Sequence, residues 1–203
     1  MDTEPRLELI IGTMFSGKST ELIRRLRRYE VVGYEVHLFK PQIDDRYSAT
    51  RVVSHDQLQK ESIAVQCAQD IASSLKPTTS LRRIIGIDEV QFLDSEVVSL
   101  CNAYANEGKI VLAAGLLKDF RDKFFTFSDG KKTMADLLAV ADSINYFSAL
   151  CTQADGNRSC GKQATRVQRF VDGEIAPVDS PVVLVGGKEA YAPRCRKHYV
   201  FYA

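Results

Sequence analysis

Apolar stretches of strand length alternate with amphipathic stretches of helical length through the first 150 residues of the chain. Short apolar runs predict strands over residues 7–12, 34–40, 82–89, 109–117 and 143–150. Apolar residues at helical spacing predict helices over residues 19–32, 65–75, 95–108 and 133–142. Strands that alternate with helices in this way favour a mostly parallel sheet covered by helices, which is an α/β fold.

The pattern changes after about residue 150, where helical periodicity stops. Residues 163–173 and 180–187 have the composition of short strands joined by a turn that contains glycine and proline. We therefore predict two domains. Residues 1–150 form a nucleotide-binding α/β domain, and residues 151–203 form a small β-rich domain.

Composition and charge narrow the classes of function. The formal net charge is +1, so no global field favours nucleic acid or a membrane surface. No apolar run approaches the roughly 18 residues of a membrane helix, and the acidic residues near the N-terminus are atypical of a signal peptide. We expect a cytoplasmic protein. The basic run 24–28 follows the polar face of a predicted helix, which favours a solvated face over a nucleic-acid site.

The sequence GTMFSGKS, residues 12–19, fits the phosphate-loop pattern G-x-x-x-x-G-K-[ST] between a predicted strand and a predicted helix. The glycines allow a tight turn whose N–H groups point at phosphate oxygens, and the helix directs its positive end toward the same place. In this arrangement Lys18 reaches the β- and γ-phosphates and Ser19 ligates Mg²⁺. The alternative is a turn that matches the pattern by chance.

Two acids, Asp88 and Glu89, end the apolar strand predicted over residues 82–89. In parallel sheets ligands bind at the carboxyl ends of strands, so these acids and the phosphate loop are expected to share one site. Asp88 is suited to hold Mg²⁺ opposite Ser19. Adjacent acids also occur in ATPases, where the glutamate activates water, so the pair does not identify the group that accepts the phosphate.

Arg46, in the loop IDDRYS, is a candidate to bind the triphosphate, because a guanidinium group pairs well with phosphate oxygens. The alternative is an ordinary turn, since Asp-Asp-Arg is also a common turn sequence.

Three cysteines and a histidine in the last quarter of the chain, Cys151, Cys160, Cys195 and His198, are a candidate tetrahedral zinc set. Cys195 and His198 have the two-residue gap of a zinc knuckle, but eight residues separate Cys151 from Cys160. The alternative is a set of unrelated thiols with a surface histidine. Cys67 and Cys101 lie in apolar helical patterns and are predicted to be buried thiols.

Four stretches together resemble the type II thymidine kinase family, the cellular and poxviral class: GTMFSGKSTELIRRLRRYE, IDDRYS followed by SHD, GIDEVQF, and VVLVGGKEAYAPRCRKHY. The resemblance runs from about residue 7 to residue 200. It implies a RecA-like P-loop domain and a zinc-binding domain with a lasso loop. It also implies transfer of the ATP γ-phosphate, with Mg²⁺, to the 5′-hydroxyl of thymidine or deoxyuridine in nucleotide salvage. The family members are homotetramers that the end product dTTP inhibits.

The resemblance also assigns roles to residues, with Glu89 as the catalytic base and Asp88 on the magnesium side. It assigns the ATP phosphates to Gly12, Thr13, Met14, Phe15, Ser16, Gly17, Lys18, Ser19, Thr20, Asp44, Asp45, Arg46, Asp88 and Gln91. It assigns thymidine to Met14, Phe92, Leu116, Phe120, Phe125, Val167, Val182, Val183, Leu184, Val185, Gly186 and Tyr191, of which 182–186 are the lasso.

Three departures from the family pattern concern the zinc and base sites. The first cysteine pair is wider than the usual two-residue gap, His198 stands where many members have cysteine, and AAGLLKDF replaces the usual turn before Phe120. Two other classes stay open as alternatives. One is a RecA-like ATPase acting on nucleic acid, and the other is a nucleotide-binding or zinc-ribbon interaction module.

Overall fold

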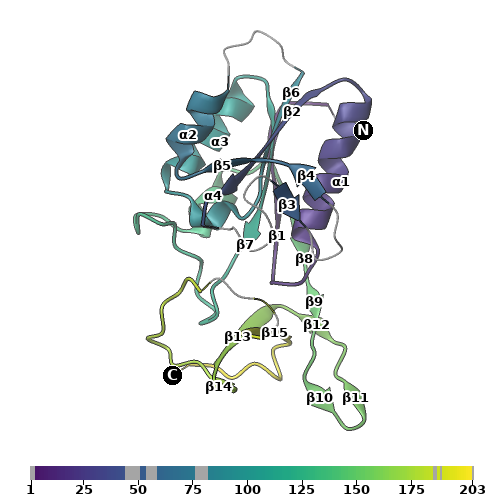
Figure 1. Ribbon diagram of the computed structural model, residues 1–203, viewed down its shortest axis with the longest axis vertical. Coiled ribbons are helices and arrows are strands. Elements are labelled where there is room, and N and C mark those ends of the chain that lie inside the picture. Colours follow the sequence, from purple (N-terminus) through teal and green to yellow (C-terminus); the bar gives the residue numbers. More distant parts are fainter. Residues whose placement is uncertain are drawn as a thin grey trace.

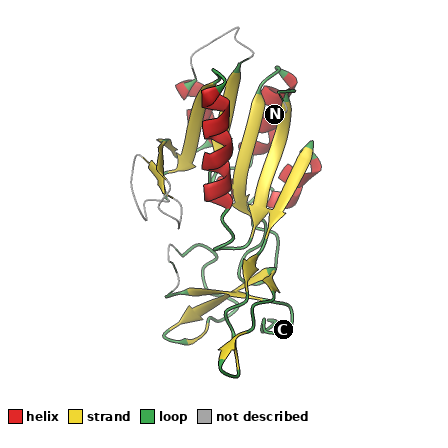
Figure 2. Cartoon of the chain, turned by 90° about the vertical axis from the view of Figure 1, so that its right-hand side faces the viewer, coloured by secondary structure: helices red, strands yellow, loops and turns green. Residues whose placement is uncertain are grey.

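The computed structural model describes residues 3–43, 51–53, 59–75, 82–184, 187 and 189–202. An α/β part occupies one end of the elongated molecule and a small β-rich part the other (Figures 1 and 2). The α/β part contains β1 (Arg6–Gly12), α1 (Lys18–Val31), β2 (Glu35–Pro41), β3 (Arg51–Val53), β4 (Gln59–Glu61), β5 (Ile63–Val65), α2 (Ala68–Ser74), β6 (Arg83–Ile87), the 3₁₀ turn η1 (Val90–Phe92), α3 (Glu96–Asn106), β7 (Ile110–Leu116), α4 (Met134–Ala139) and β8 (Ser143–Phe147).

Six strands form one sheet in the order β5-β2-β6-β7-β1-β8, and every neighbouring pair is parallel. The central strands β6 and β7 are buried along their whole length. Continuous burial is what covering both faces of a parallel sheet requires, and it explains why these segments read as unbroken apolar runs. The sheet and its helices confirm the α/β prediction.

Helix α1 covers one face of the sheet. Its residues Leu22, Ile23 and Leu26 are fully buried and belong to one apolar cluster with Ile10 of β1 and Leu112 of β7. The spacing of these three positions places them on one side of the helix, as the sequence pattern predicts. This packing fixes α1, and therefore the loop before it, against the carboxyl end of β1.

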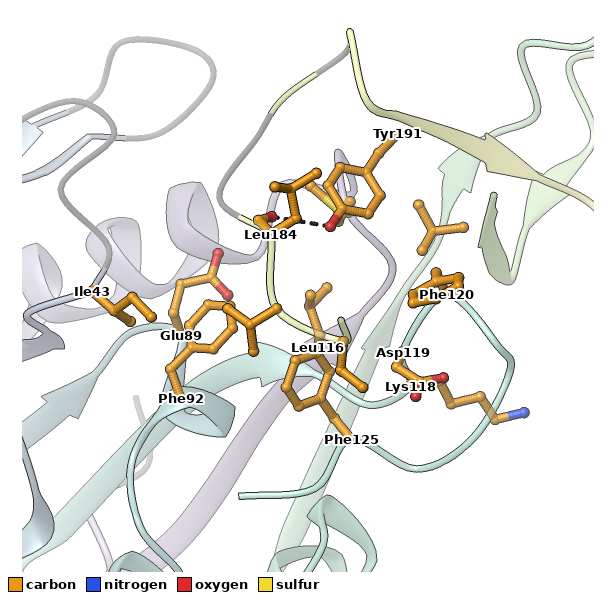
Figure 3. Close-up of a pocket in the computed structure, with 14 residues that line it drawn as sticks. Ile43, Glu89, Phe92, Leu116, Lys118, Asp119, Phe120, Phe125, Leu184 and Tyr191 are labelled. Carbon is orange, nitrogen blue, oxygen red and sulfur yellow. Dashed lines mark hydrogen bonds between the residues drawn. The ribbon is translucent and has the colours of Figure 1, made fainter. Parts of the chain in front are cut away.

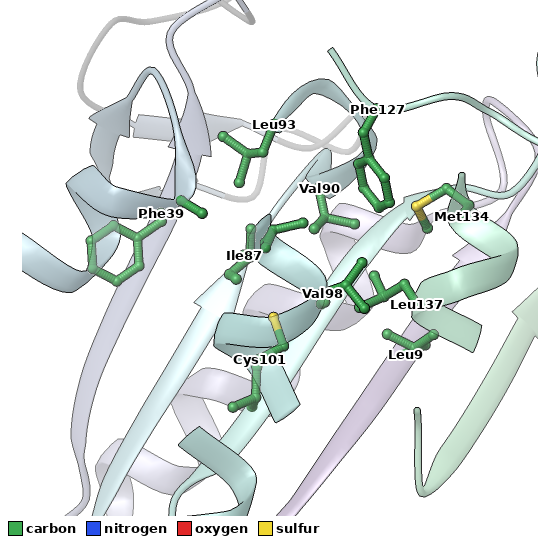
Figure 4. Close-up of a cluster of buried hydrophobic side chains, with 14 of the residues drawn as sticks. Leu9, Phe39, Ile87, Val90, Leu93, Val98, Cys101, Phe127, Met134 and Leu137 are labelled. Carbon is green, nitrogen blue, oxygen red and sulfur yellow. The ribbon is translucent and has the colours of Figure 1, made fainter. Parts of the chain in front are cut away.

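Helices α2, α3 and α4 cover the opposite face (Figure 1). Leu9 of β1 turns toward this side and clusters with Val98, Cys101 and Leu137, which are drawn in Figure 4. Burial raises the pKa of the Cys101 thiol to about 12, so this cysteine stays protonated and acts as an apolar side chain. Cys67, in contrast, is only half-buried and stands at the N-terminus of α2, so the prediction that it is a core thiol is wrong.

Two arginines in the basic run of α1, Arg24 and Arg25, pair with acids. The Nε atoms of Arg24 and Arg25 lie 2.6 Å and 2.7 Å from carboxylate oxygens of Glu21, and Arg25 also pairs with Glu8 of β1. The guanidinium of Arg24, with that of Arg25, lowers the pKa of Glu21 to about 2. Arg24, Arg27 and Arg28 are exposed. The prediction of a solvated face therefore holds for these three, while Arg25 ties α1 to the sheet.

The small β-rich part consists of antiparallel pairs. It contains β9 (Ala149–Leu150), β10 (Ala154–Asp155), β11 (Arg158–Ser159), β12 (Gln163–Ala164), β13 (Arg166–Val171), β14 (Glu174–Ile175) and β15 (Tyr191–Arg194). β12 pairs with β9, β10 with β11, and β13 lies between β14 and β15. Among the described residues, no helix occurs after residue 150, in agreement with the loss of helical periodicity.

Several element predictions need correction. The strand predicted over 143–150 is two strands, β8 and β9, and the helix predicted over 65–75 begins only at Ala68, after strand β5. The strand predicted over 180–187 is wrong for the described residues 180–184 and 187, which form a loop. Ser95 precedes α3, but its hydroxyl donates to Asp129 at 2.6 Å instead of accepting from the helix.

Helices long and apolar enough to cross a membrane are absent from the described part of the chain.

Candidate functional site

The phosphate loop connects the end of β1 to the start of α1, and two glycines shape it. A Cβ on Gly12 would lie 1.9 Å from the carbonyl oxygen of Phe147 in β8, so a larger residue cannot fit there. Gly17 has φ 83° at the N-cap of α1, a left-handed conformation that glycine adopts at low cost. Steric constraints in this fold therefore explain why both fixed positions of the motif are glycine.

The lysine of the loop is buried and turned back into it. Lys18 Nζ donates to the carbonyl oxygen of Thr13 at 2.8 Å, and Ser16 Oγ donates to the same oxygen at 2.8 Å. Thr20 lies in the first turn of α1, and Phe15 packs against the apolar clusters of the small β-rich part. The residues expected at the ATP phosphates, from Gly12 to Thr20, thus run from the end of β1 through the loop into the first turn of a 14-residue helix, at its positive end.

Asp88 follows β6 directly and meets the phosphate loop. Its side chain is buried, and its Oδ1 accepts a hydrogen bond from Ser19 Oγ at 3.1 Å. The strand-end argument from the sequence is confirmed in this respect, because two segments 69 positions apart in the chain meet at one edge of the sheet. A hydroxyl and a carboxylate at this separation are oxygen donors of the kind that Mg²⁺ binds.

Glu89 departs from the strand conformation. It has φ 48° and ψ 42°, the left-handed region, at the start of the 3₁₀ turn η1. A non-glycine residue held there costs on the order of 1 kcal/mol or more and persists where surrounding contacts enforce it. This conformation, and not simple alternation along a strand, separates the direction of Glu89 from that of Asp88. The Glu89 carboxylate faces an apolar cavity (Figure 3).

Gln91 fixes the Glu89 carboxylate. Its Nε2 donates to Glu89 Oε2 at 2.6 Å, and its Oε1 accepts from the backbone N–H of Leu116 at 3.0 Å. Gln91 is only 1% exposed, so its amide is enclosed between these two partners. The resemblance places Gln91 with the residues that bind ATP phosphates. In the structure its side chain joins the candidate base to a wall of the cavity.

A cavity lies beside Glu89, and the space between its walls amounts to about 560 Å³ when the part open to solvent is included. Its wall is mostly apolar, and Met14 of the phosphate loop is part of it. Every residue that the resemblance assigns to thymidine and that the structure describes lines this cavity: Met14, Phe92, Leu116, Phe120, Phe125, Val167, Val182, Val183, Leu184 and Tyr191.

Three further residues line the cavity that the sequence did not single out: Ile43, Lys118 and Asp119. Lys118 Nζ pairs with Asp122 at 2.9 Å, and Asp119 accepts from the backbone N–H of Arg121 at 2.9 Å. Both belong to the turn that carries Phe120. The charged pattern KDFRDK was the available signal for such a turn, whereas nothing in the sequence distinguished Ile43.

Five predicted site residues lie outside the described residues: Asp44, Asp45, Arg46, Val185 and Gly186. Their assignments stay predictions.

The described part of the lasso, residues 182–184, is held by side chains of the neighbouring strands. Tyr191 Oη, from β15, donates to the carbonyl oxygen of Leu184 at 3.0 Å (Figure 3). Arg169 of β13 donates to the carbonyl oxygen of Pro181. These side-chain hydrogen bonds take the place of the backbone hydrogen bonds that a neighbouring strand would provide. This explains why an apolar run whose sequence predicts a strand forms a loop here.

The four candidate zinc ligands come together in the small β-rich part. The ligand atoms of Cys151, Cys160, Cys195 and His198 all lie within 4.8 Å of one another. The eight residues between the first two cysteines form the β10–β11 hairpin, and Cys160 N–H donates to the carbonyl oxygen of Gln153 at 2.8 Å. The hairpin thus returns the chain to the cluster, so the wide spacing does not prevent convergence.

The distances fit a tetrahedral metal centre. Sγ of Cys151 and Sγ of Cys195 each lie 3.6 Å from Nδ1 of His198. A tetrahedral zinc ion, with bonds of about 2.3 Å to sulfur and about 2.0 Å to nitrogen, places such atoms about 3.5 Å apart. Three cysteines and one histidine complete the four positions, which is the ligand set of a closed structural site. The alternative of unrelated thiols does not explain this geometry.

The matches to known proteins cover the residues of this site. The family model described as thymidine kinase matches residues 5–199. The thymidine kinase of Thermococcus kodakarensis is 43% identical over 196 residues, which cover 96% of this chain and 93% of that protein. The match therefore includes both the phosphate loop and the metal cluster.

Proposed function

Because this chain belongs to the thymidine kinase family, we propose that it transfers the γ-phosphate of ATP to the 5′-hydroxyl of thymidine, yielding dTMP and ADP. The observation that carries the proposal is the position of Met14, which belongs to the phosphate loop and also lines the cavity that the Glu89 carboxylate faces. Phosphate donor, proton acceptor and nucleoside slot are then within reach of one another.

The phosphate end of the site uses the loop and its lysine. The N–H groups of residues 12–19 bind phosphate oxygens, and Lys18 neutralises charge that develops on the γ-phosphoryl group. Ser19 and Asp88 are the residues that we assign to Mg²⁺, because their oxygens face each other at 3.1 Å. An ion held there would supply further neutralisation of the charge that develops on the transferred phosphoryl group.

The acceptor end uses Glu89. We assign it the proton of the attacking 5′-hydroxyl, a role that requires a hydrogen bond of roughly 2.6–3.2 Å to the nucleoside oxygen. Gln91 holds one oxygen of this carboxylate at 2.6 Å and so limits its rotation. The hydroxyl is then activated inside a largely apolar cavity, where water competes poorly as a phosphate acceptor.

The base is expected to lie among the apolar side chains of the cavity. Phe120 provides an aromatic face, and Met14, Leu116 and Tyr191 surround the position expected for the thymine methyl group. Such a methyl pocket adds about 1–3 kcal/mol for thymine over uracil. The remaining recognition falls to backbone groups of the lasso, which read the donor and acceptor pattern of a pyrimidine.

We predict that incubation with γ-labelled ATP and a panel of nucleosides yields labelled monophosphate from thymidine and, with lower kcat/KM, from deoxyuridine. The expected ratio is about 10-fold to 200-fold, which is the size of a single-methyl preference. Deoxycytidine and purine nucleosides serve as the comparison because they present a different donor pattern or size. A preference for deoxycytidine would contradict the assignment of the base site.

The same experiment separates the kinase from a RecA-like ATPase. An ATPase of that class would release inorganic phosphate, respond to added DNA and label no nucleoside. The pairing of Arg24 and Arg25 with Glu21 and Glu8 offsets part of the basic charge of α1, which favours the kinase.

We also propose that the cluster of Cys151, Cys160, Cys195 and His198 binds one structural zinc ion. Replacing Cys151 by serine is expected to abolish zinc binding and to lower Tm by roughly 6 °C or more, because a structural zinc ion contributes at least several kcal/mol to folding and each kcal/mol corresponds to about 2–4 °C in a chain of this size. Zinc content by atomic absorption and Tm by calorimetry would check both. Cys67→Ser is the matched control, since Cys67 lies at the start of α2 and outside the cluster. A Cys151→Ser protein that keeps one equivalent of zinc would contradict the ligand assignment.

Three further features follow from the family and are part of the proposal. We expect dTTP to inhibit, because its thymine fits the base cavity while its triphosphate extends toward the phosphate loop. A homotetramer and a cytoplasmic location, where ATP and free nucleosides are available, complete the account.

A further inference from the structure

A hydroxyl from the end of the chain reaches the main chain of the base-binding wall. Tyr199 Oη donates to the carbonyl oxygen of Phe120 at 2.6 Å, between residues 79 positions apart in the sequence. Tyr199 and Phe120 are 4% and 2% exposed, so the bond is shielded from water. Nothing in the proposed mechanism uses this bond.

The backbone of Tyr199 is fixed by the candidate metal cluster. The N–H groups of His198 and Tyr199 both donate to the carbonyl oxygen of Cys195 at 3.0 Å, which forms a tight turn between two ligands and the tyrosine. The next residue, Val200, donates its N–H to Gln168 of β13 at 2.9 Å. Tyr199 is thus attached on both sides to rigid parts of the small β-rich part.

Phe120, in turn, stands on a turn without regular secondary structure. Asp119 closes this turn, because its Oδ1 accepts from the N–H groups of Arg121 at 2.9 Å and Lys123 at 3.1 Å. The Phe120 ring lines the cavity near Tyr191 (Figure 3) and packs edge-on against Tyr202, with ring centroids 5.6 Å apart. The Tyr199 bond holds the carbonyl group of Phe120 and so fixes the peptide from which the ring projects.

We propose that Tyr199 is a positioning residue for the nucleoside base, since its hydroxyl holds Phe120 at the wall of the cavity and links that wall to the metal-binding cluster. The proposal rests on the proposed function, in which Phe120 contacts the base. A shift of this ring would weaken binding of the nucleoside. It would leave ATP binding and the transfer step unchanged, because Lys18 and Glu89 lie on other elements.

A purely structural role for Tyr199 makes a different prediction. If the tyrosine only fills the core, loss of its hydroxyl lowers stability and affects both substrates equally. The split between the KM for thymidine and the KM for ATP therefore distinguishes the two roles.

The test is Tyr199→Phe, which removes one oxygen and keeps the ring. We expect the KM for thymidine, and its Kd by calorimetric titration, to rise about 5-fold to 10-fold, the change expected if most of the free energy of this buried hydrogen bond serves to hold Phe120 in position for the base. The KM for ATP, kcat and zinc content are expected to stay within 2-fold of the parent values, on the order of experimental scatter. Tyr202→Phe is the matched control: it loses the hydroxyl bond from Gln168 at 3.1 Å but keeps the ring against Phe120.

Two results would overturn the proposal: an unchanged Kd for thymidine in Tyr199→Phe, or an equal loss of affinity for ATP. Phe120→Leu separates this failure from failure of the proposed function. If Phe120→Leu weakens thymidine binding and Tyr199→Phe does not, only the positioning role is wrong. If Phe120→Leu has no effect, the base site itself is misassigned and the role of Tyr199 falls with it.

Discussion

Replacing Lys18 by alanine is expected to lower kcat for thymidine phosphorylation by about 10³ or more, to the limit of detection. Lys18 is buried in the phosphate loop, and its ammonium group is the only cation among residues 12–19. A charge acting in a site from which water is excluded contributes far more than one in solution. The measurement is transfer of labelled phosphate at saturating thymidine, over a range of ATP concentrations.

Arg24→Ala is the control for that experiment. Arg24 lies on the same helix as Lys18 but points to solvent, where it pairs with Glu21. Its removal is expected to leave kcat unchanged. Full turnover in the Lys18→Ala protein would mean that the loop does not hold the transferred phosphate.

Replacing Glu89 by glutamine is expected to lower kcat by about 10² or more, because the amide cannot accept the proton of the attacking hydroxyl. Glutamine has nearly the same shape, and its side-chain oxygen can still accept the bond from Gln91 that Glu89 accepts at 2.6 Å. ATP and thymidine binding are therefore expected to change little. Single-turnover kinetics, with Kd values from titration, would separate the chemical step from binding.

Glu96→Gln provides the comparison, since Glu96 is an exposed acid in the first turn of α3, outside the cavity. We expect it to retain the parent kcat. An unchanged kcat for Glu89→Gln would remove Glu89 from the role of base and would leave Asp88 as the acid to examine.

The fold of the α/β part could be predicted because its signals are local. Strands such as residues 7–12 and 109–117 are buried for most of their length and are therefore mostly apolar, and α1 carries Leu22, Ile23 and Leu26 at helical spacing. The meeting of Ser19 and Asp88 followed from parallel topology, which places strand ends at one edge.

The loop at 180–184 and the contacts of Gln91 could not be predicted, because they depend on contacts between distant segments, which local patterns do not encode. The run at 180–184 has a strand-like sequence, but its carbonyl groups bond to side chains of Arg169 and Tyr191, so it forms a loop. Gln91 gives no sign in the sequence that its partners are Glu89 and Leu116.

The metal cluster also depends on a contact that the local sequence pattern does not predict. Spacing alone made Cys160 the weakest ligand assignment, because a loop of eight residues has no preferred closure. The β10–β11 hairpin supplies that closure and brings the thiol to the other three ligands.

The central claim is that the phosphate loop, Glu89 and the apolar cavity form one site for both substrates. The most direct measurement is inhibition by a dinucleotide in which adenosine and thymidine are joined through their 5′-oxygens by a polyphosphate. The account predicts that this compound competes with ATP and with thymidine, and that it binds more tightly than either nucleotide half alone. Competition with only one of the two substrates would show that the loop and the cavity belong to separate sites.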